Sequence, residues 1–233
     1  MSSSLFDEAW ARVCQLATDF KANEEHYLSP GYTEAQVRPD FIDKFFMALG
    51  WDVHHEHQKN PYEQEASVEE PVHASGQRRA DYAFFLAPNF RDVRFFVEAK
   101  KPHGDIATAD NYFQTIRYAW NSETPLAVLT DFEQFQILDC RYKPDRDSAL
   151  NRCIAKYHYS HYLKKEKFAE IYWLFSREAL AEGRLEKYAA GLPKPRGKAI
   201  QRGLFEGGWQ SIDESFLQEL DEYREQLAKA FKK

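Results

Sequence analysis

The chain has 233 residues and a net charge of −6, and 43% of its residues are hydrophobic. This apolar fraction can fill a packed core, which excludes global disorder. No apolar run approaches the ~18 residues that a membrane-spanning helix needs, and Met1 is followed by serines rather than by a signal segment. The three cysteines have neither zinc-site spacing nor the pattern of a disulfide framework. We therefore expect a cytoplasmic protein with no membrane partner.

Charge is unevenly distributed along the chain. Residues 1–75 carry 14 acidic and 5 basic side chains. Two later stretches are basic: 141–167 has 8 bases and 3 acids, and 184–202 has 6 bases and 1 acid. A basic face for a polyanion is therefore compatible with the acidic total. Runs of charge are more often ordinary solvated surface, so this pattern permits nucleic-acid binding without predicting it.

The chain is predicted to open with helices. Apolar side chains recur at helical spacing over 5–20, which indicates an amphipathic helix. A second helix is predicted over 39–49, with Pro39 in its first turn. Thr33 and Gln36 have the spacing of a capping box, so the alternative is a helix that begins at Thr33 and bends at Pro39.

The centre of the chain predicts a sheet. The polar stretch 52–78 indicates strand fragments and loop, and more regular elements follow it. In order, these are strands over 80–86 and 93–100, a helix over 108–120, and strands over 126–130 and 135–140. This order predicts an α/β fold, with a mixed central sheet flanked by helices.

The last third of the chain changes character. A helix is predicted over 163–180, and 183–208 is rich in glycine, proline and basic residues, as a linker would be. A final helix is predicted from its apolar stripe. That stripe comprises Phe216, Leu220, Tyr223, Leu227 and Phe231. We therefore expect a core over 1–160 and a helical connector over 161–233.

Charged side chains gather at the end of the second predicted strand. Because strand side chains alternate, Glu98 and Lys100 share one otherwise polar face, whereas Val97 and Ala99 face the core. If the first two strands form a hairpin, Asp81 comes close to Glu98. The carboxylates would suit Mg²⁺, and Lys100 would orient a water and stabilise its hydroxide form. The alternative is a cross-strand salt bridge on a solvated face.

The helix that follows carries two further polar side chains. Gln114 and Tyr118 lie four residues apart and so share one helix face. From there both can reach the cleft beside Lys100, where the amide would hold a phosphate or a water. The alternative is a polar helix face with a partly buried tyrosine.

Together these residues resemble the PD-(D/E)xK nuclease superfamily, in its Gln-x-x-x-Tyr-bearing branch. The matching motifs are Ala80-Asp81, Glu98-Ala99-Lys100 and Gln114-Thr115-Ile116-Arg117-Tyr118. Residues 33–42 and 49–53 resemble the opening of type I restriction subunits and of type IIG enzymes. Residues 171–178 and 212–217 resemble the connector before the methyltransferase in fused type IIG enzymes.

The resemblance implies a restriction-endonuclease-like fold and a set of site residues. The implied site comprises the metal ligands Asp81, Glu98 and the backbone carbonyl of Ala99, the catalytic lysine Lys100, the accessory pair Gln114 and Tyr118, and Glu34, an early helical acid that supports the metal or its water. Mg²⁺ is the implied cofactor, with Mn²⁺ as a substitute. Ala80 stands where the superfamily name has proline, at a position that varies freely.

The function implied by the resemblance is that of a metal-dependent, type II-like site-specific deoxyribonuclease. The chain would be the cleavage module of a fused restriction-modification enzyme and would end where the methyltransferase begins. Its partners would be double-stranded DNA and, in the full-length chain, methyltransferase and target-recognition domains. A transient dimer on DNA would supply one site per strand. The alternatives are a catalytically silent DNA-docking module, the nuclease domain of a type I restriction subunit, and an interaction domain in which these charges form salt bridges.

Two further features have open interpretations. His103 lies three residues past Lys100, where it either contacts a phosphate or belongs to an ordinary loop. The aromatic stretch 157–162 either lines a DNA strand or packs under the helix that follows it.

Overall fold

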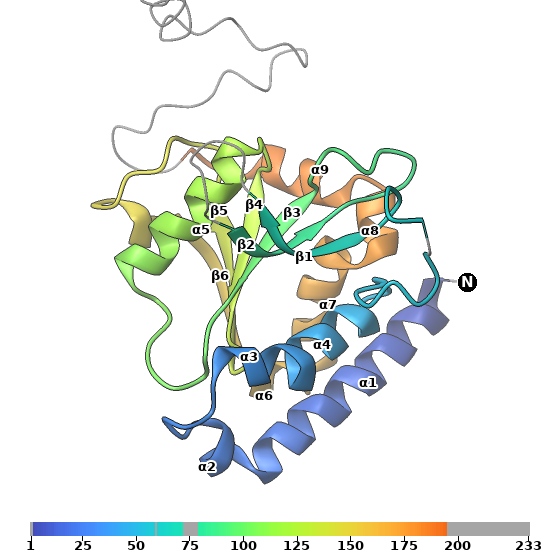
Figure 1. Ribbon diagram of the computed structural model, residues 1–233, viewed down its shortest axis with the longest axis vertical. Coiled ribbons are helices and arrows are strands. Elements are labelled where there is room, and N and C mark those ends of the chain that lie inside the picture. Colours follow the sequence, from blue (N-terminus) through green and yellow to red (C-terminus); the bar gives the residue numbers. More distant parts are fainter. Residues whose placement is uncertain (1, 59, 72–78, 195–233) are drawn as a thin grey trace, which may run out of the picture. The chain divides into compact units, whose positions relative to one another are not determined.

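The computed structural model describes residues 2–58, 60–71 and 79–194 and has a central sheet with helices on both sides (Figure 1). The helices are α1 (Ser2–Ala22), α2 (Glu24–Tyr27), α3 (Glu34–Val37), α4 (Asp43–Ala48), α5 (Ala109–Asn121), α6 (Tyr159–Tyr162), α7 (Lys165–Phe175), α8 (Arg177–Ala181) and α9 (Arg184–Gly191). A π-helical turn, η1 (Arg38–Ile42), joins α3 to α4, and a 3₁₀ turn, η2 (Ala149–Arg152), precedes β6. The strands are β1 (Ala66–Pro71), β2 (Arg79–Phe84), β3 (Phe95–Ala99), β4 (Leu126–Thr130), β5 (Gln134–Asp139) and β6 (Cys153–His158).

The strands form one six-stranded sheet in chain order, from β1 to β6. Neighbouring strands are antiparallel except β3 and β4, which are parallel. Helix α5 makes the crossover between those two strands, as a parallel pair requires (Figure 1). The predicted α/β fold with a mixed, helix-flanked sheet is confirmed.

Both faces of the sheet are buried, which corrects the expectation of a polar face around Glu98. Phe95 and Val97 of β3 face α1, α4 and α7, as predicted. Phe96, on the same face as Glu98, is buried against Tyr112 and Ile116 of α5. The crossover helix covers this face, so Glu98 lies at the end of an apolar layer rather than on solvated surface.

The N-terminal helical run follows the second of the two predicted alternatives. It begins after Thr33, whose backbone N–H donates to Gln36 Oε1 at 2.9 Å, and it continues through Pro39 to the end of α4. The run passes Pro39 as the π-helical turn η1, where the wider winding accommodates a residue without an N–H. Glu34 and Arg38 therefore lie one turn apart on a continuous helical segment.

Two elements differ from the sequence expectations. The basic stretch 141–167 contains an edge strand, β6, which pairs with β5 and which charge alone did not indicate. The predicted helix over 163–180 is divided into α7 and α8. The division falls at Ser176, whose hydroxyl accepts from Ala179 N at 3.2 Å and caps the second helix.

The first part of the predicted linker over 183–208 is helical. It forms α9, which buries Leu185 and Ala189 in the same core as α1 and α7. The rest of this stretch beyond Lys194 lies outside the described residues, as does the predicted helix with its stripe from Phe216 to Phe231. The division into a core and a connector at residue 160 stays a prediction.

Arg141 anchors the end of α9 to the sheet. Its guanidinium forms two hydrogen bonds with the Asp139 carboxylate, both at 2.9 Å. It also donates to three backbone carbonyls at the C-terminal end of α9, those of Ala189, Leu192 and Pro193. The last carbonyls of a helix lack N–H partners further along it, so an arginine that binds carbonyls at and just after the helix end acts as a C-terminal cap.

The aromatic stretch 157–162 packs in the core, as one of its two interpretations predicted. Tyr157, Tyr159 and Tyr162 are all buried, and Tyr162 donates to the Phe132 carbonyl at 3.0 Å. These rings are therefore unavailable for stacking on bases. Within the described part of the chain, no helix combines the length and the apolar character needed to cross a membrane.

Candidate active site

Asp81 lies where strands β2 and β3 part. The last paired positions are Tyr82 and Val97, and continuing this register would place Asp81 opposite Glu98. Among the residues that the structure describes, the two strands form no further backbone pair here. Instead, the Asp81 carboxylate accepts a hydrogen bond from the backbone N–H of Ala99, with Oδ2 at 2.8 Å. The opening between the strands thus brings a side-chain carboxylate to the β3 backbone.

Glu98 and Lys100 form a close ion pair on the sheet face covered by α5. Lys100 Nζ lies 2.6 Å from Glu98 Oε1, and the Glu98 side chain is only 4% exposed. The backbone of Lys100 is fixed to β4, because its N–H donates to the Thr130 carbonyl at 2.9 Å. The other carboxylate oxygen, Glu98 Oε2, is buried and has no hydrogen-bond partner among the described residues.

Helix α5 brings the predicted accessory pair to the same carboxylate. Gln114 Nε2 donates to Glu98 Oε1 at 2.7 Å and lies 3.1 Å from the Tyr118 hydroxyl. Tyr118 is buried, whereas Gln114 is partly exposed. The i, i+4 spacing therefore places Gln114 at Glu98 and Tyr118 beside Gln114. A functional role for the pair, against the alternative of a polar helix face with a buried tyrosine, stays a prediction.

Glu34 approaches the same cluster from the start of α3. It is half-buried, and its pKa is raised by burial and then by the charge of Asp81, while Lys100 and Arg38 act to lower it. It also helps to raise the pKa of Glu98. The structure thus brings Glu34 into electrostatic contact with the predicted ligands. For Ala99 it shows a buried residue whose N–H is bonded, and the role of its carbonyl stays a prediction.

The neighbouring acids shift the pKa values of both Glu98 and Lys100. Burial, followed by the charge of Asp81, raises the pKa of Glu98 to about 7, against the opposing effect of Lys100. For Lys100, burial favours the neutral amine, but Glu98, Glu34 and Asp81 outweigh it and raise its pKa. Lys100 therefore stays an ammonium, while Glu98 titrates near neutral pH. Such shifts are frequent at functional sites.

The side chains of Asp81, Glu98 and Glu34 offer the oxygen ligands that a hard cation needs, but they are not yet arranged as a closed metal site. Within residues 2–58, 60–71 and 79–194, no three His, Cys, Asp or Glu side chains are grouped tightly enough to hold a metal ion. The cluster nevertheless offers carboxylate oxygens, which hard cations prefer. One of them, Glu98 Oε2, is buried without a partner, an arrangement that costs free energy until a cation or donor meets it.

Two ionisable residues near these strand ends were not singled out from the sequence. Arg38 Nη1 lies 3.6 Å from Asp81 Oδ1. Its only sequence signal is the i, i+4 spacing from Glu34. Asp131, directly after β4, is fully buried, and burial is the main cause that raises its pKa to about 8. No pattern in the sequence distinguishes it from a turn residue.

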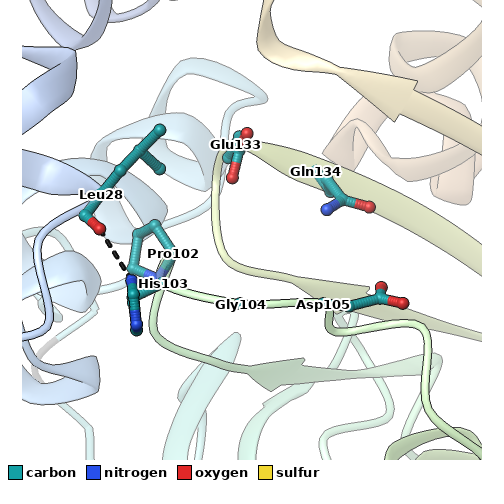
Figure 2. Close-up of a pocket in the computed structure, with 7 residues that line it drawn as sticks. All are labelled: Leu28, Pro102, His103, Gly104, Asp105, Glu133 and Gln134. Carbon is teal, nitrogen blue, oxygen red and sulfur yellow. Dashed lines mark hydrogen bonds between the residues drawn. The ribbon is translucent and has the colours of Figure 1, made fainter.

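A separate pocket of about 390 Å³ lies beside the loop that follows Lys100 (Figure 2). Its lining includes Leu28, His103, Asp105 and Glu133, but none of the predicted site residues. Figure 2 shows His103 directed at the Leu28 carbonyl, with Nδ1 at 2.9 Å. The two acids make this pocket a poor place for a phosphate. A phosphate contact for His103 stays a prediction.

Comparison with known proteins supports the resemblance. No family model matches the chain. Over 222 residues, or 93% of its length, the chain is 32% identical to the type II restriction enzyme and methyltransferase RM.Eco57I of Escherichia coli, and it spans 21% of that protein. Among solved structures it is similar to the type IIG restriction endonuclease BpuSI. That match has a TM-score of 0.38 and 14% identity, and it covers 51% of this chain and 14% of the other. The predicted resemblance to fused restriction-modification enzymes is confirmed.

Proposed function

From this similarity and the geometry of the cluster, we propose that the chain is a metal-dependent DNA endonuclease domain. It would hydrolyse phosphodiester bonds as the cleavage module of a bifunctional restriction-modification enzyme. The observation that carries the proposal is the environment of Glu98. This buried carboxylate contacts Lys100 and Gln114 through one oxygen and leaves the other unmet. A solvated salt bridge would leave neither oxygen buried and unmet.

Asp81 and Glu98 would hold the cation, with the Ala99 carbonyl as a third ligand and Glu34 supporting it or its water. Mg²⁺ takes one or two carboxylates together with water and substrate phosphate, which matches this set, and Mn²⁺ would substitute. When bound, the metal would supply Lewis acidity to the scissile phosphate and acidify a water. Because Lys100 and Gln114 both donate to Glu98 Oε1, they leave Oε2 for the cation.

The chain's own side chains would then have distinct tasks. The Lys100 ammonium, held beside Glu98, would stabilise negative charge on the attacking oxygen and on the phosphate. Gln114 would keep Glu98 in one orientation, and Tyr118 would hold the Gln114 amide through its hydroxyl. The proposal therefore assigns catalysis to the β3 end and orientation to α5.

The partners of the proposed enzyme follow from the same assignment. Double-stranded DNA would be the substrate, and specificity would come from methyltransferase and target-recognition domains elsewhere in a longer chain. Because one site cuts one strand, double-strand cleavage would require a transient dimer on DNA. A cytoplasmic location is part of this proposal.

The proposal is tested by incubating the chain with supercoiled plasmid and Mg²⁺ or Mn²⁺. We expect nicking by the wild type and a loss of about 10²–10³-fold in Lys100→Ala, the scale of removing one charge-stabilising donor from an active site. Lys101→Ala is the matched control, because Lys101 is the next residue and its side chain is exposed. Nicking at the wild-type rate in Lys100→Ala would overturn the proposed function.

A further inference from the structure

Arg38 is a mostly buried cation that lies against Asp81. Its side chain is 16% exposed, and that of Asp81 is 15% exposed. The guanidinium reaches Asp81 from η1, on the helical run that also carries Glu34, whereas Asp81 belongs to β2. The contact therefore connects the N-terminal helices to the point where β2 and β3 separate.

Two buried side chains brace the Arg38 guanidinium. Its Cζ atom lies 5.1 Å from the centre of the Tyr82 ring, a cation–π distance. The Tyr82 hydroxyl in turn donates to Asp43 Oδ1 at 2.6 Å. Because Tyr82 and Asp43 are both buried and bonded to each other, the ring against which the guanidinium lies is held in place.

The charge around Asp81 needs such a neighbour. The carboxylates of Glu34, Asp81 and Glu98 lie close enough to act on one another electrostatically. Lys100 contacts Glu98, and Arg38 contacts Asp81, so the two cations offset different acids of the cluster. Without Arg38, repulsion from the other acids would act on Asp81 with less compensation.

We propose that Arg38 is a positioning residue, which holds the Asp81 carboxylate against Ala99 N and ready to bind a cation. It acts through Asp81 and touches neither substrate nor metal. This inference rests on the proposed function, since Asp81 is a ligand only in that nuclease. Loss of Arg38 would let Asp81 rotate away from β3 and would slow catalysis without changing the affinity for DNA.

The first test uses the metal-free protein and follows amide hydrogen exchange by NMR. In Arg38→Met we expect the Ala99 amide to exchange about tenfold faster, because its hydrogen bond to Asp81 opens more often. The Val97 amide, in the same strand, should not change. Arg94→Met is the matched control, since Arg94 is also partly buried and pairs with Glu186 just before β3. Unchanged exchange at Ala99 in Arg38→Met would overturn the proposal.

The second test measures plasmid nicking under single-turnover conditions. We expect the maximal rate of Arg38→Met to fall about tenfold or more while half-saturation in DNA stays within about twofold. Arg38→Lys, which keeps the charge, should recover most of the rate. A loss confined to DNA affinity, or a lysine variant as slow as methionine, would refute the positioning role. If Arg38→Met does not fold, Arg38→Gln replaces it as the uncharged variant.

A parallel measurement on Lys100→Ala separates the inference from the proposed function. If Lys100→Ala still nicks DNA, the proposed function fails and the nicking data on Arg38 lose their basis. If Lys100→Ala is inactive but Arg38→Met nicks at the wild-type rate, the proposed function stands and only the role of Arg38 is refuted.

Discussion

Two buried carboxylates lie at corresponding ends of the parallel strands β3 and β4. Ala99 pairs with Thr130 across these strands, so Glu98 and Asp131 lie on either side of the same rung. Both residues are at most 3% exposed, and each has one carboxylate oxygen without a partner in the described part of the chain. Burial is the main cause that raises the pKa of Glu98 to about 7 and of Asp131 to about 8.

The two sites differ in what meets the other oxygen. Glu98 Oε1 receives two side-chain donors, Lys100 and Gln114, with Asp81 nearby. Asp131 Oδ1 accepts from a backbone donor, the N–H of Gln134 at 2.6 Å, within the turn between β4 and β5. Its charged neighbours are the acids Glu133 and Asp105. Burial alone therefore does not identify a catalytic acid. We expect Glu98 to govern activity and Asp131 to govern stability.

The largest expected effect is that of Glu98→Gln on cleavage. The amide keeps an acceptor for Lys100 and Gln114 but cannot serve as an anionic metal ligand. We expect plasmid nicking to fall about 10³-fold, because a metal ion contributes several kcal/mol to the transition state. Mn²⁺ binding, measured by calorimetry, should weaken in parallel, while the melting temperature should not fall. Nicking within about tenfold of the wild type would contradict the assignment of Glu98.

An intermediate effect is expected from Gln114→Leu. This change removes the amide that orients Glu98, but it leaves Lys100 and both proposed ligands in place. We expect a loss of about 10–100-fold in the nicking rate, the scale of a hydrogen bond to a charged group. Gln15→Leu is a control on α1, because Gln15 also bonds a single carboxylate, that of Asp19. Equal rates in wild type and Gln114→Leu would show that α5 has no orienting role.

The smallest expected effect is that of Asp131→Asn, and it concerns stability. Folding raises the pKa of Asp131 from 3.8 to about 8, so the folded state favours the protonated carboxyl. The stability that this carboxyl contributes is therefore fully present below about pH 4 and is lost as the pH rises to about 8. Asparagine keeps an oxygen acceptor for Gln134 but does not ionise, so the stability of the variant does not fall with pH for this reason. We expect the free energy of unfolding at pH 8.5 to rise by at least ~1 kcal/mol relative to wild type, with no gain at pH 4.

Denaturant unfolding at both pH values measures this effect. The raised pKa of Glu98 also lowers stability as the pH rises to about 7. The stabilities of the proteins with and without Asp131→Asn are therefore best compared again in the Glu98→Gln background. Nicking by Asp131→Asn should stay within about twofold of the wild type. A large loss of nicking with unchanged stability would reverse the division between the two carboxylates.

The sequence predicted the parts of the site that depend on local periodicity. Strand alternation placed Glu98 and Lys100 together, and helical spacing placed Gln114 and Tyr118 on one face, because both periods are properties of short backbone segments. The predicted hairpin placed Asp81 near Glu98, and the family resemblance supplied Glu34. These residues come from elements whose types and approximate bounds were also predictable.

The remaining features depend on contacts between distant segments. Arg38 meets Asp81 only because η1 packs against the end of β2, and no short-range pattern encodes that approach. The burial of Phe96 beside Glu98 follows from the crossover of α5, which periodicity along β3 does not reveal. Strand β6 was not predicted either, because its sequence shows no clear strand pattern. It is an edge strand with mostly half-exposed side chains and no strict alternation.

The Arg141 anchor at the end of α9 limits the movement of the point from which the following chain starts. Its hydrogen bonds to the Leu192 and Pro193 carbonyls fix the backbone just before Lys194 to the end of β5. A tether that starts from a fixed point samples a smaller volume than one that starts from a moving helix, so the effective concentration of a tethered domain depends on the length and stiffness of the tether itself. Under the proposed function, a linker that starts at this anchor would keep a DNA-reading domain within a range of the cutting site that the linker's length and stiffness determine.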